Sequence, residues 1–278
     1  MKLNKSLVIP SIAFFLLAVT LCMGWRSTNS ARPIAHHAKK MEEKETKRSI
    51  LVTNFESTYQ QIKAFAPTLD SNVFKQAYIG YLNLRDQGKT HSSILSIADL
   101  SIHSSQPRLW IIDLADDRVL VNTFVAHGRG SGLTEAKSFS NRPNSNQSSL
   151  GFYLTGETYQ GKHGRSLRLD GLDEGFNTNA RARGIVLHGA WYVGSKILKG
   201  QDRMGVSQGC PAVAEALKDK IINLIKDKSV LYIHGSSKTY HSALLNEQLA
   251  TESLMASSIT PEKTLLDSME LNESGGLL

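Results

Sequence analysis

Residues 108–128 read RLWIIDLADDRVLVNTFVAHG, and this stretch decides the fold. Its two runs, 108–114 and 118–128, are rich in β-branched and large apolar residues, and the segment 115–117 between them carries two aspartates. Runs of this composition on either side of a short polar turn predict a β-hairpin. Four more stretches, bounded by Gly, Asn or Asp, have the same character: 149–159, 166–170, 184–189 and 229–235. We therefore expect a mainly β protein.

Three stretches with helical spacing flank these strands. Apolar residues recur every three or four positions in 51–66, which ends at a proline, and in 70–88, which starts at an Asp-Ser pair typical of a helix N-cap. A third helix is predicted over 211–229, with Pro211 at its first position. The expected fold class is α+β, with two N-terminal helices, a β-sandwich or barrel, and one helix that follows Cys210.

The composition excludes several classes of protein. The chain has 278 residues, of which 41% are hydrophobic and 21% are charged. This length accommodates one medium domain with appendages. The ordinary composition excludes a wholly disordered chain and a multi-span membrane protein. The formal net charge of +7 suits an anionic partner, but the basic residues are scattered, so we expect no nucleic acid.

The N-terminus has the pattern of an export signal. Lys2 and Lys5 precede the uncharged run 6–25, SLVIPSIAFFLLAVTLCMGW, in the order of a basic n-region and an apolar h-region. The run is also about long enough to cross a bilayer. Residues 1–31 are therefore predicted to be a cleaved signal peptide or an anchor that attaches the chain to the inner membrane through residues 6–25. A lipoprotein site at Cys22 is disfavoured by the leucine before it. Each interpretation places the protein in the periplasm or cell envelope.

Composition also divides the rest of the chain. Residues 32–49 are charged without apolar periodicity and predict a solvated linker. The strands and helices lie in 50–235, the expected domain. Residues 236–278 carry six acidic residues against two lysines and predict an acidic, disordered tail. Within the domain, the polar stretch 128–150 is too long for a passive connection. It is interpreted as a substrate loop or lid, or as a plain surface insertion.

Cys210 is the one thiol that remains once the predicted signal peptide or anchor, residues 1–31, is set aside. Such an unpaired cysteine outside the cytoplasm predicts an intermolecular bridge or a reactive thiol. The predicted helix begins directly after it, and a helix N-terminus favours the thiolate and lowers the pKa of a cysteine. Gly209 lets substrate approach, and the N–H groups of Gly209 and Cys210 would form an oxyanion hole. Ser207 would cap this turn or bind the base.

A thiol nucleophile needs a base to take its proton. Four histidines follow or end predicted strands, His127, His163, His188 and His234. We favour His188, because it is paired with the Ser-x-Gly-Cys turn and is followed by Gly189, which permits close approach.

These residues carry a resemblance to a known family. His188-Gly189 followed by Ser207-x-Gly209-Cys210 resembles the signature of the YkuD-type murein L,D-transpeptidase catalytic domain family. The runs AHGRGSG, SSLGFYLTGETYQGKHGRSLRLDGL and ARARGIVLHGAWYV extend the likeness over residues 50–235. The resemblance implies an exported enzyme without metal or cofactor, in which Cys210 forms a thioester with a tetrapeptide stem of peptidoglycan and His188 is the base. A second stem amine would resolve the thioester.

The sequence departs from the family pattern beside the cysteine. Gln208 stands where many members have His or Arg, and this removes a natural partner for a stem-peptide carboxylate. Arg203, Arg183 and Lys162 are candidate replacements. The predicted substrate-binding residues are His127, His163, Gly189 and Arg203.

Other functions remain open on the sequence. Water in place of the amine would give an L,D-carboxypeptidase, and another cysteine peptidase or amidase acting on wall peptides would use the same two residues. A wall-binding module with an inert Cys210 is the non-enzymatic alternative. A metal hydrolase using the histidines is disfavoured, because no HExxH or CxxC pair exists. The oligomeric state is left open.

Overall fold

The structure, a computed structural model, describes residues 31–256. The chain divides into two compact units, Met1–Thr46 and Lys47–Leu278. The described part of the first unit is the beginning of helix α2 (Ala31–Lys63). The charged segment 32–49, where we expected a solvated linker, is therefore helical, which its Ala, Lys, Glu and Met residues favour.

The predicted signal peptide or anchor falls almost entirely outside the described residues. Among residues 31–256, no helix is both long enough and apolar enough to cross a membrane.

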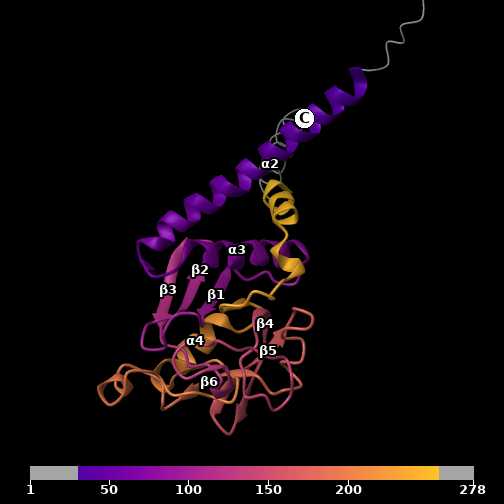
Figure 1. Ribbon diagram of the computed structural model, residues 1–278. Coiled ribbons are helices and arrows are strands. Elements are labelled where there is room, and N and C mark those ends of the chain that lie inside the picture. The colour runs from indigo at the N-terminus through magenta and orange to yellow at the C-terminus, as the bar shows by residue number, and fades with distance from the viewer. Residues whose placement is uncertain (1–30, 257–278) are drawn as a thin grey trace, which may run out of the picture. The chain divides into compact units, whose positions relative to one another are not determined.

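The second unit is built on one sheet of eight strands (Figure 1). Their order across the sheet is β3-β2-β1-β8-β4-β5-β6-β7. The β1/β8 and β6/β7 pairs are parallel and the other neighbours are antiparallel. The strands are β1 (Ile94–Asp99), β2 (Leu109–Asp113), β3 (Arg118–Thr123), β4 (Gly151–Gly161), β5 (Gly164–Gly171), β6 (Val186–Ala190), β7 (Ala212–Ala214) and β8 (Val230–His234). All of the predicted strands are present, which confirms the mainly β class.

The two edges of the sheet meet, so that it forms a nearly closed, barrel-like structure. The segment after β3 reaches β7, where the Ala126 N–H donates to the Ala212 carbonyl at 2.8 Å and the Ala212 N–H donates back at 3.3 Å. A second bridge joins Gly128 to Ser207. This closure places the start of the polar stretch 128–150 beside the turn that precedes Cys210.

Strand alternation builds two cores, one on each face of the sheet. In β8, Val230 and Tyr232 pack into the first core while Leu231 and Ile233 pack into the second. The first core is covered by the C-terminal half of α2 and by α3 (Ser71–Asp86) (Figure 1). The second is covered by the short helix α4 (Lys218–Ile225).

The two helices predicted before the strands are present, and the third differs from the prediction. As predicted, α3 is capped by Asp70, whose side chain accepts hydrogen bonds from two backbone N–H groups of the first turn. The helix predicted over 211–229 is shorter, because Ala212–Ala214 form β7 and pair with β6 instead. A 3₁₀ turn, Glu215–Leu217, then leads into α4. Cys210 therefore precedes a strand, and the predicted helix N-terminus at the thiol is wrong.

The segment 236–256 is packed against the domain, where we expected a disordered tail. Asn83 of α3 donates to the carbonyls of Leu244 and Asn246 at 2.7 and 3.0 Å, and Leu244 is buried. Residues 247–256 are helical. Ala250 also belongs to the first core, and Tyr240 and Leu245 pack against it. The polar and acidic composition of the segment hid these scattered apolar contacts. The remainder of the predicted tail, 257–278, lies outside the described residues.

Candidate active site

Strand β6 and the turn before β7 bring His188 and Cys210 to one place. The two strands are parallel, with His188 opposite Ala212, so the residues just before β7 run beside the start of β6. The Cys210 sulfur accepts a hydrogen bond from the Val186 N–H at 3.5 Å and lies 3.7 Å from the Gly184 carbonyl oxygen, to which the thiol donates. Main-chain groups at the start of β6 and just before it thus fix the position of the sulfur.

The turn before Cys210 is held by Ser207. Its hydroxyl donates to the Cys210 carbonyl at 2.6 Å and accepts from the Gly209 N–H at 3.1 Å. Gly209 has a φ of +125°, and a Cβ there would lie 2.9 Å from the Gln147 carbonyl oxygen, so the turn requires glycine. The Gly209 N–H is occupied, whereas within residues 31–256 the Cys210 N–H has no acceptor. The oxyanion donor that remains is the N–H of Cys210.

His188 is held in one tautomer. Its Nδ1 lies 2.7 Å from the Gly189 carbonyl oxygen. A carbonyl only accepts, so Nδ1 carries the proton and Nε2 is left with a lone pair. Burial lowers the pKa of His188, and the hydrogen bond to Gly189 opposes this shift. The ring is therefore neutral at pH 7 and can accept a proton.

The Cys210 thiol differs from the expected thiolate. Burial raises its pKa, and the Val186 N–H and the charges of Lys162 and Arg183 only partly offset that effect. The helix charge that was expected to ionise it is absent, because β7 follows the residue. The resting groups are a protonated thiol and a neutral imidazole in one cavity, an arrangement that is suited to general-base catalysis.

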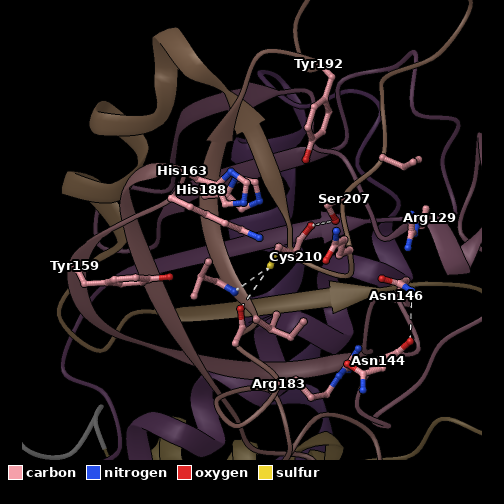
Figure 2. A pocket seen from close by; sticks show the side chains of 16 residues that line it. Arg129, Asn144, Asn146, Tyr159, His163, Arg183, His188, Tyr192, Ser207 and Cys210 are labelled. Atoms are coloured by element: carbon pink, nitrogen blue, oxygen red, sulfur yellow. Dashed lines mark hydrogen bonds between the residues drawn. The ribbon is translucent and has the colours of Figure 1, made fainter.

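Both residues line one cavity of about 420 Å³ (Figure 2). Three cationic side chains and no carboxylate line it, which suits an anionic ligand. Two tyrosines and two asparagines add polar groups to its wall. The lining residues are Arg129, Asn144, Asn146, Tyr159, Lys162, His163, Arg183, Gly184, Ile185, Val186, His188, Tyr192, Val206, Ser207, Gln208 and Cys210.

Two of the three cations predicted to bind a stem carboxylate line this cavity, and the third does not. Lys162 and Arg183 line it, while Arg203 lines a neighbouring hollow and donates to the Met204 carbonyl at 3.1 Å. Arg183 is occupied by the polar stretch, since its guanidinium donates to Ser140, Ser145, Gln147 and Ser149. Among residues 31–256, no carboxylate lies within ion-pair distance of Lys162 or Arg129. These two are the cations free to meet a ligand.

Two predicted substrate contacts have other surroundings. The His127 ring is buried and does not line the cavity. Its Nδ1 accepts from Arg108 at 2.7 Å and its Nε2 donates to Gly132 at 3.1 Å. Burial, followed by the charge of Arg108, lowers its pKa to about 4. The space above Gly189 is filled by the side chain of Glu215, which a Cβ would meet at 2.4 Å. Gly189 thus makes room for protein and not for substrate.

Sequence reasoning missed several cavity residues. Arg129, Asn144 and Asn146 come from the polar stretch, which closes one side of the cavity (Figure 2). Both asparagines have positive φ values, 59° and 55°, which Asn tolerates better than most residues. Tyr159 and Tyr192 come from β4 and from the loop after β6. The length of the polar stretch was the one available signal.

The family model of the L,D-transpeptidase catalytic domain matches residues 65–234, more than half of the chain. The chain belongs to this family. The matched range contains β1 to β8 and every residue that lines the cavity. L,D-Transpeptidases act on the peptide stems of peptidoglycan.

Several solved structures are similar to the chain at low identity. An L,D-transpeptidase from Mycobacterium smegmatis is 12% identical, with a TM-score of 0.32, over 51% of this chain and 59% of its own. A variant of the helical cell shape determining protein Pgp2 from Campylobacter jejuni is 14% identical, with a TM-score of 0.34, over 64% and 62%. Residues 123–326 of an L,D-transpeptidase from Xylanimonas cellulosilytica are 15% identical, with a TM-score of 0.31, over 67% and 93%.

The chain spans less than two thirds of the first of these proteins. No curated protein matches it.

Proposed function

We propose that the protein is an exported L,D-transpeptidase that uses Cys210 as nucleophile and His188 as general base. The observation that carries this proposal is the pairing, in one cationic cavity, of a lone thiol with an imidazole whose Nε2 is free. Membership of the family supplies the substrate class, the peptide stems of peptidoglycan.

The residues support a two-step acyl transfer. The Cys210 sulfur attacks the carbonyl of the third stem residue while His188 Nε2 takes the thiol proton, and the Cys210 N–H donates to the oxyanion. Collapse of the adduct breaks the amide bond, and His188 returns the proton to the departing D-Ala amine. The amine of a second stem then attacks the thioester, passes a proton through His188 to the sulfur, and frees the cross-linked product.

Lys162 and Arg129 support recognition of the stem carboxylates. They take the place of the cation that Gln208 lacks, and both are exposed at the rim of the cavity. Exposed cations steer an anionic substrate and orient it with little desolvation cost.

The decisive experiment incubates the body of the protein, residues 47–256, with purified tetrapeptide muropeptides and resolves the products by mass spectrometry. We expect a cross-linked dimer, free D-Ala and a thioester adduct on Cys210. Cys210→Ala should give none of these products, and its thermal unfolding should stay unchanged. Cys22 provides no substitute nucleophile, because residues 47–256 do not include it. An adduct that persists in Cys210→Ala refutes the assignment of the nucleophile. Trimmed monomer without dimer would replace transfer by carboxypeptidase activity.

A further inference from the structure

A second histidine ring lies flat against the proposed base. The rings of His163 and His188 stack with centroids 4.2 Å apart and planes 19° from parallel, and both line the cysteine cavity (Figure 2). We propose that His163 is a positioning residue, which holds the His188 imidazole in the orientation that aims Nε2 at the reacting thiol. The inference rests on the proposed function of His188 as the base.

The backbone explains why the two rings meet. Gly161 pairs with Gly164, so Lys162 and His163 form a two-residue hairpin tip between β4 and β5, where Gly164 has a φ of +71°. Further along β5, Ser166 is directly opposite His188 of β6. The tip therefore stands over the strand that carries the base.

The hairpin is braced at its base, so the ring is presented by a fixed element. Arg165 donates to Asn223 at 2.7 Å and to Asp219 at 3.4 Å, which ties the start of β5 to α4. The Ser166 hydroxyl donates to the Gly164 carbonyl at 3.1 Å. A residue that orients a catalytic group has to be held by its own surroundings. These contacts hold the backbone of the hairpin, and the stack on His188 holds the exposed His163 ring.

The base needs this support. The hydrogen bond from Nδ1 to Gly189 fixes one atom of the His188 ring but leaves the ring free to tilt about that atom. A stacked aromatic neighbour restricts the tilt, because offset, nearly parallel rings attract each other. The ring contact that the structure shows for His163 is the stack on His188. That contact favours a role of His163 through the His188 ring.

A double-mutant cycle tests this inference. The readouts are kcat and KM with muropeptides, and the rate at which iodoacetamide alkylates Cys210. We expect His163→Ala to lower both kcat and the alkylation rate, kcat by roughly 10-fold to 100-fold, the cost of a misplaced catalytic group. In a His188→Ala background the same substitution should change either rate by less than about twofold, because coupled residues are not additive. An undiminished effect there would overturn the proposal.

Two further variants separate stacking from other roles. His163→Phe keeps a flat ring and should restore kcat to within about threefold of the original protein, given the similar stacking of the two rings; failure of this rescue would also overturn the proposal. Arg142→Ala, at an exposed arginine outside the cavity, is the matched control and should leave both kcat and the alkylation rate unchanged. Alkylation by iodoacetamide needs only the thiol and its base. A protein whose alkylation rates change as expected but which does not react with muropeptides would refute the proposed substrate and leave the role of His163 standing.

Discussion

Burial shifts the pKa values of Cys210 and His188 in opposite directions. Burial raises the pKa of the thiol and lowers the pKa of the imidazole, because a low-dielectric site disfavours the charged form of each group. Both shifts favour the neutral pair over a thiolate beside an imidazolium. In the proposed mechanism the proton is therefore transferred as the substrate is attacked, and the activation of Cys210 depends on the orientation of His188.

The pH dependence of alkylation follows from these directions. A raised thiol pKa means that the thiolate fraction is small near neutrality and grows as pH rises. In His188→Ala, where only the thiolate reacts, we expect the iodoacetamide rate at Cys210 to increase by about tenfold per pH unit between roughly pH 6 and 8, with no plateau below the ordinary thiol value of about 8.5. Mass spectrometry of the alkylated protein measures this rate. In the unsubstituted protein the neutral His188 assists the thiol, so we expect a faster reaction near neutrality that depends less steeply on pH. A rate in His188→Ala that is already level at pH 6 would contradict the raised pKa of the thiol.

The sequence singles out the proposed nucleophile and the proposed base but not all of their neighbours in the cavity. Cys210 and His188 stood out because their residue types and flanking glycines define the chemistry. His127 and His163 were indistinguishable by the same reasoning, since each is a histidine beside a glycine at the end of a strand. The two histidines differ because the hairpin 161–164 places His163 against His188. That placement depends on the pairing of β5 with β6, which local sequence does not reveal.

At the scale of elements, β7 shows how long-range pairing overrides local preference. The stretch 211–217 has apolar residues at helical spacing, yet its first part is extended because β6 offers backbone partners at Ala212–Ala214. The partner strand that stabilises this extended conformation lies more than twenty residues away in the sequence. The local hydrophobic periodicity of 211–217 carries no information about such a partner. The consequence is chemical, because the cysteine loses the helix charge that the local pattern implied.

The polar stretch 128–150 is held by Arg183. Its guanidinium donates to the Ser140 carbonyl at 2.6 Å and to the Gln147 carbonyl at 2.7 Å, and half-buried charged hydrogen bonds of this kind contribute about 1.5–3 kcal/mol. Whether the stretch acts as a lid stays a prediction.

We expect Arg183→Ala to loosen the stretch and to raise KM for muropeptides on the order of 10-fold. That factor corresponds to a loss of about 1.4 kcal/mol of binding free energy. Limited proteolysis within 132–148 should become faster. Arg142→Ala changes an exposed arginine of the same stretch and is the matched control, for which both quantities should stay unchanged. Equal proteolysis of the two variants would show that Arg183 does not hold the stretch.

At the scale of the whole molecule, the site lies where the sheet closes on itself. The closing hydrogen bonds join Ala126 to Ala212, two residues after the nucleophile. The composition of each strand predicted its existence, but the meeting of the first and last strands in the sheet order depends on twist and register accumulated over all eight. For this reason the class of fold was predictable and the composition of the cavity was not.

The segment 236–256 stabilises the domain through buried polar contacts. Asp173 accepts from the Phe152 N–H at 2.8 Å, from the Tyr240 hydroxyl at 2.7 Å and from the Ser242 hydroxyl at 2.5 Å. Without the segment, the Asp173 carboxylate and the Asn83 amide would both lose partners.

We expect a chain ending at residue 235 to be less stable than one ending at 256 by roughly 2–5 kcal/mol, since each buried polar group left without a partner costs about 1–3 kcal/mol. Urea unfolding followed by tryptophan fluorescence measures the difference. Tyr240→Phe in the longer chain removes a single hydroxyl and should lower stability by only about 1 kcal/mol. Equal stability of the two chains would show that the segment does not contribute to the fold.

The burial that keeps the Cys210 thiol protonated also affects how long the protein survives. Peroxide and mixed disulfides react with the thiolate, and a half-buried sulfur that is ionised only in small part offers them little to attack. Under the proposed export, the thiol would face oxidising surroundings, in which cysteines are not kept reduced. A thiol that stays protonated at rest would then be oxidised more slowly than a resting thiolate.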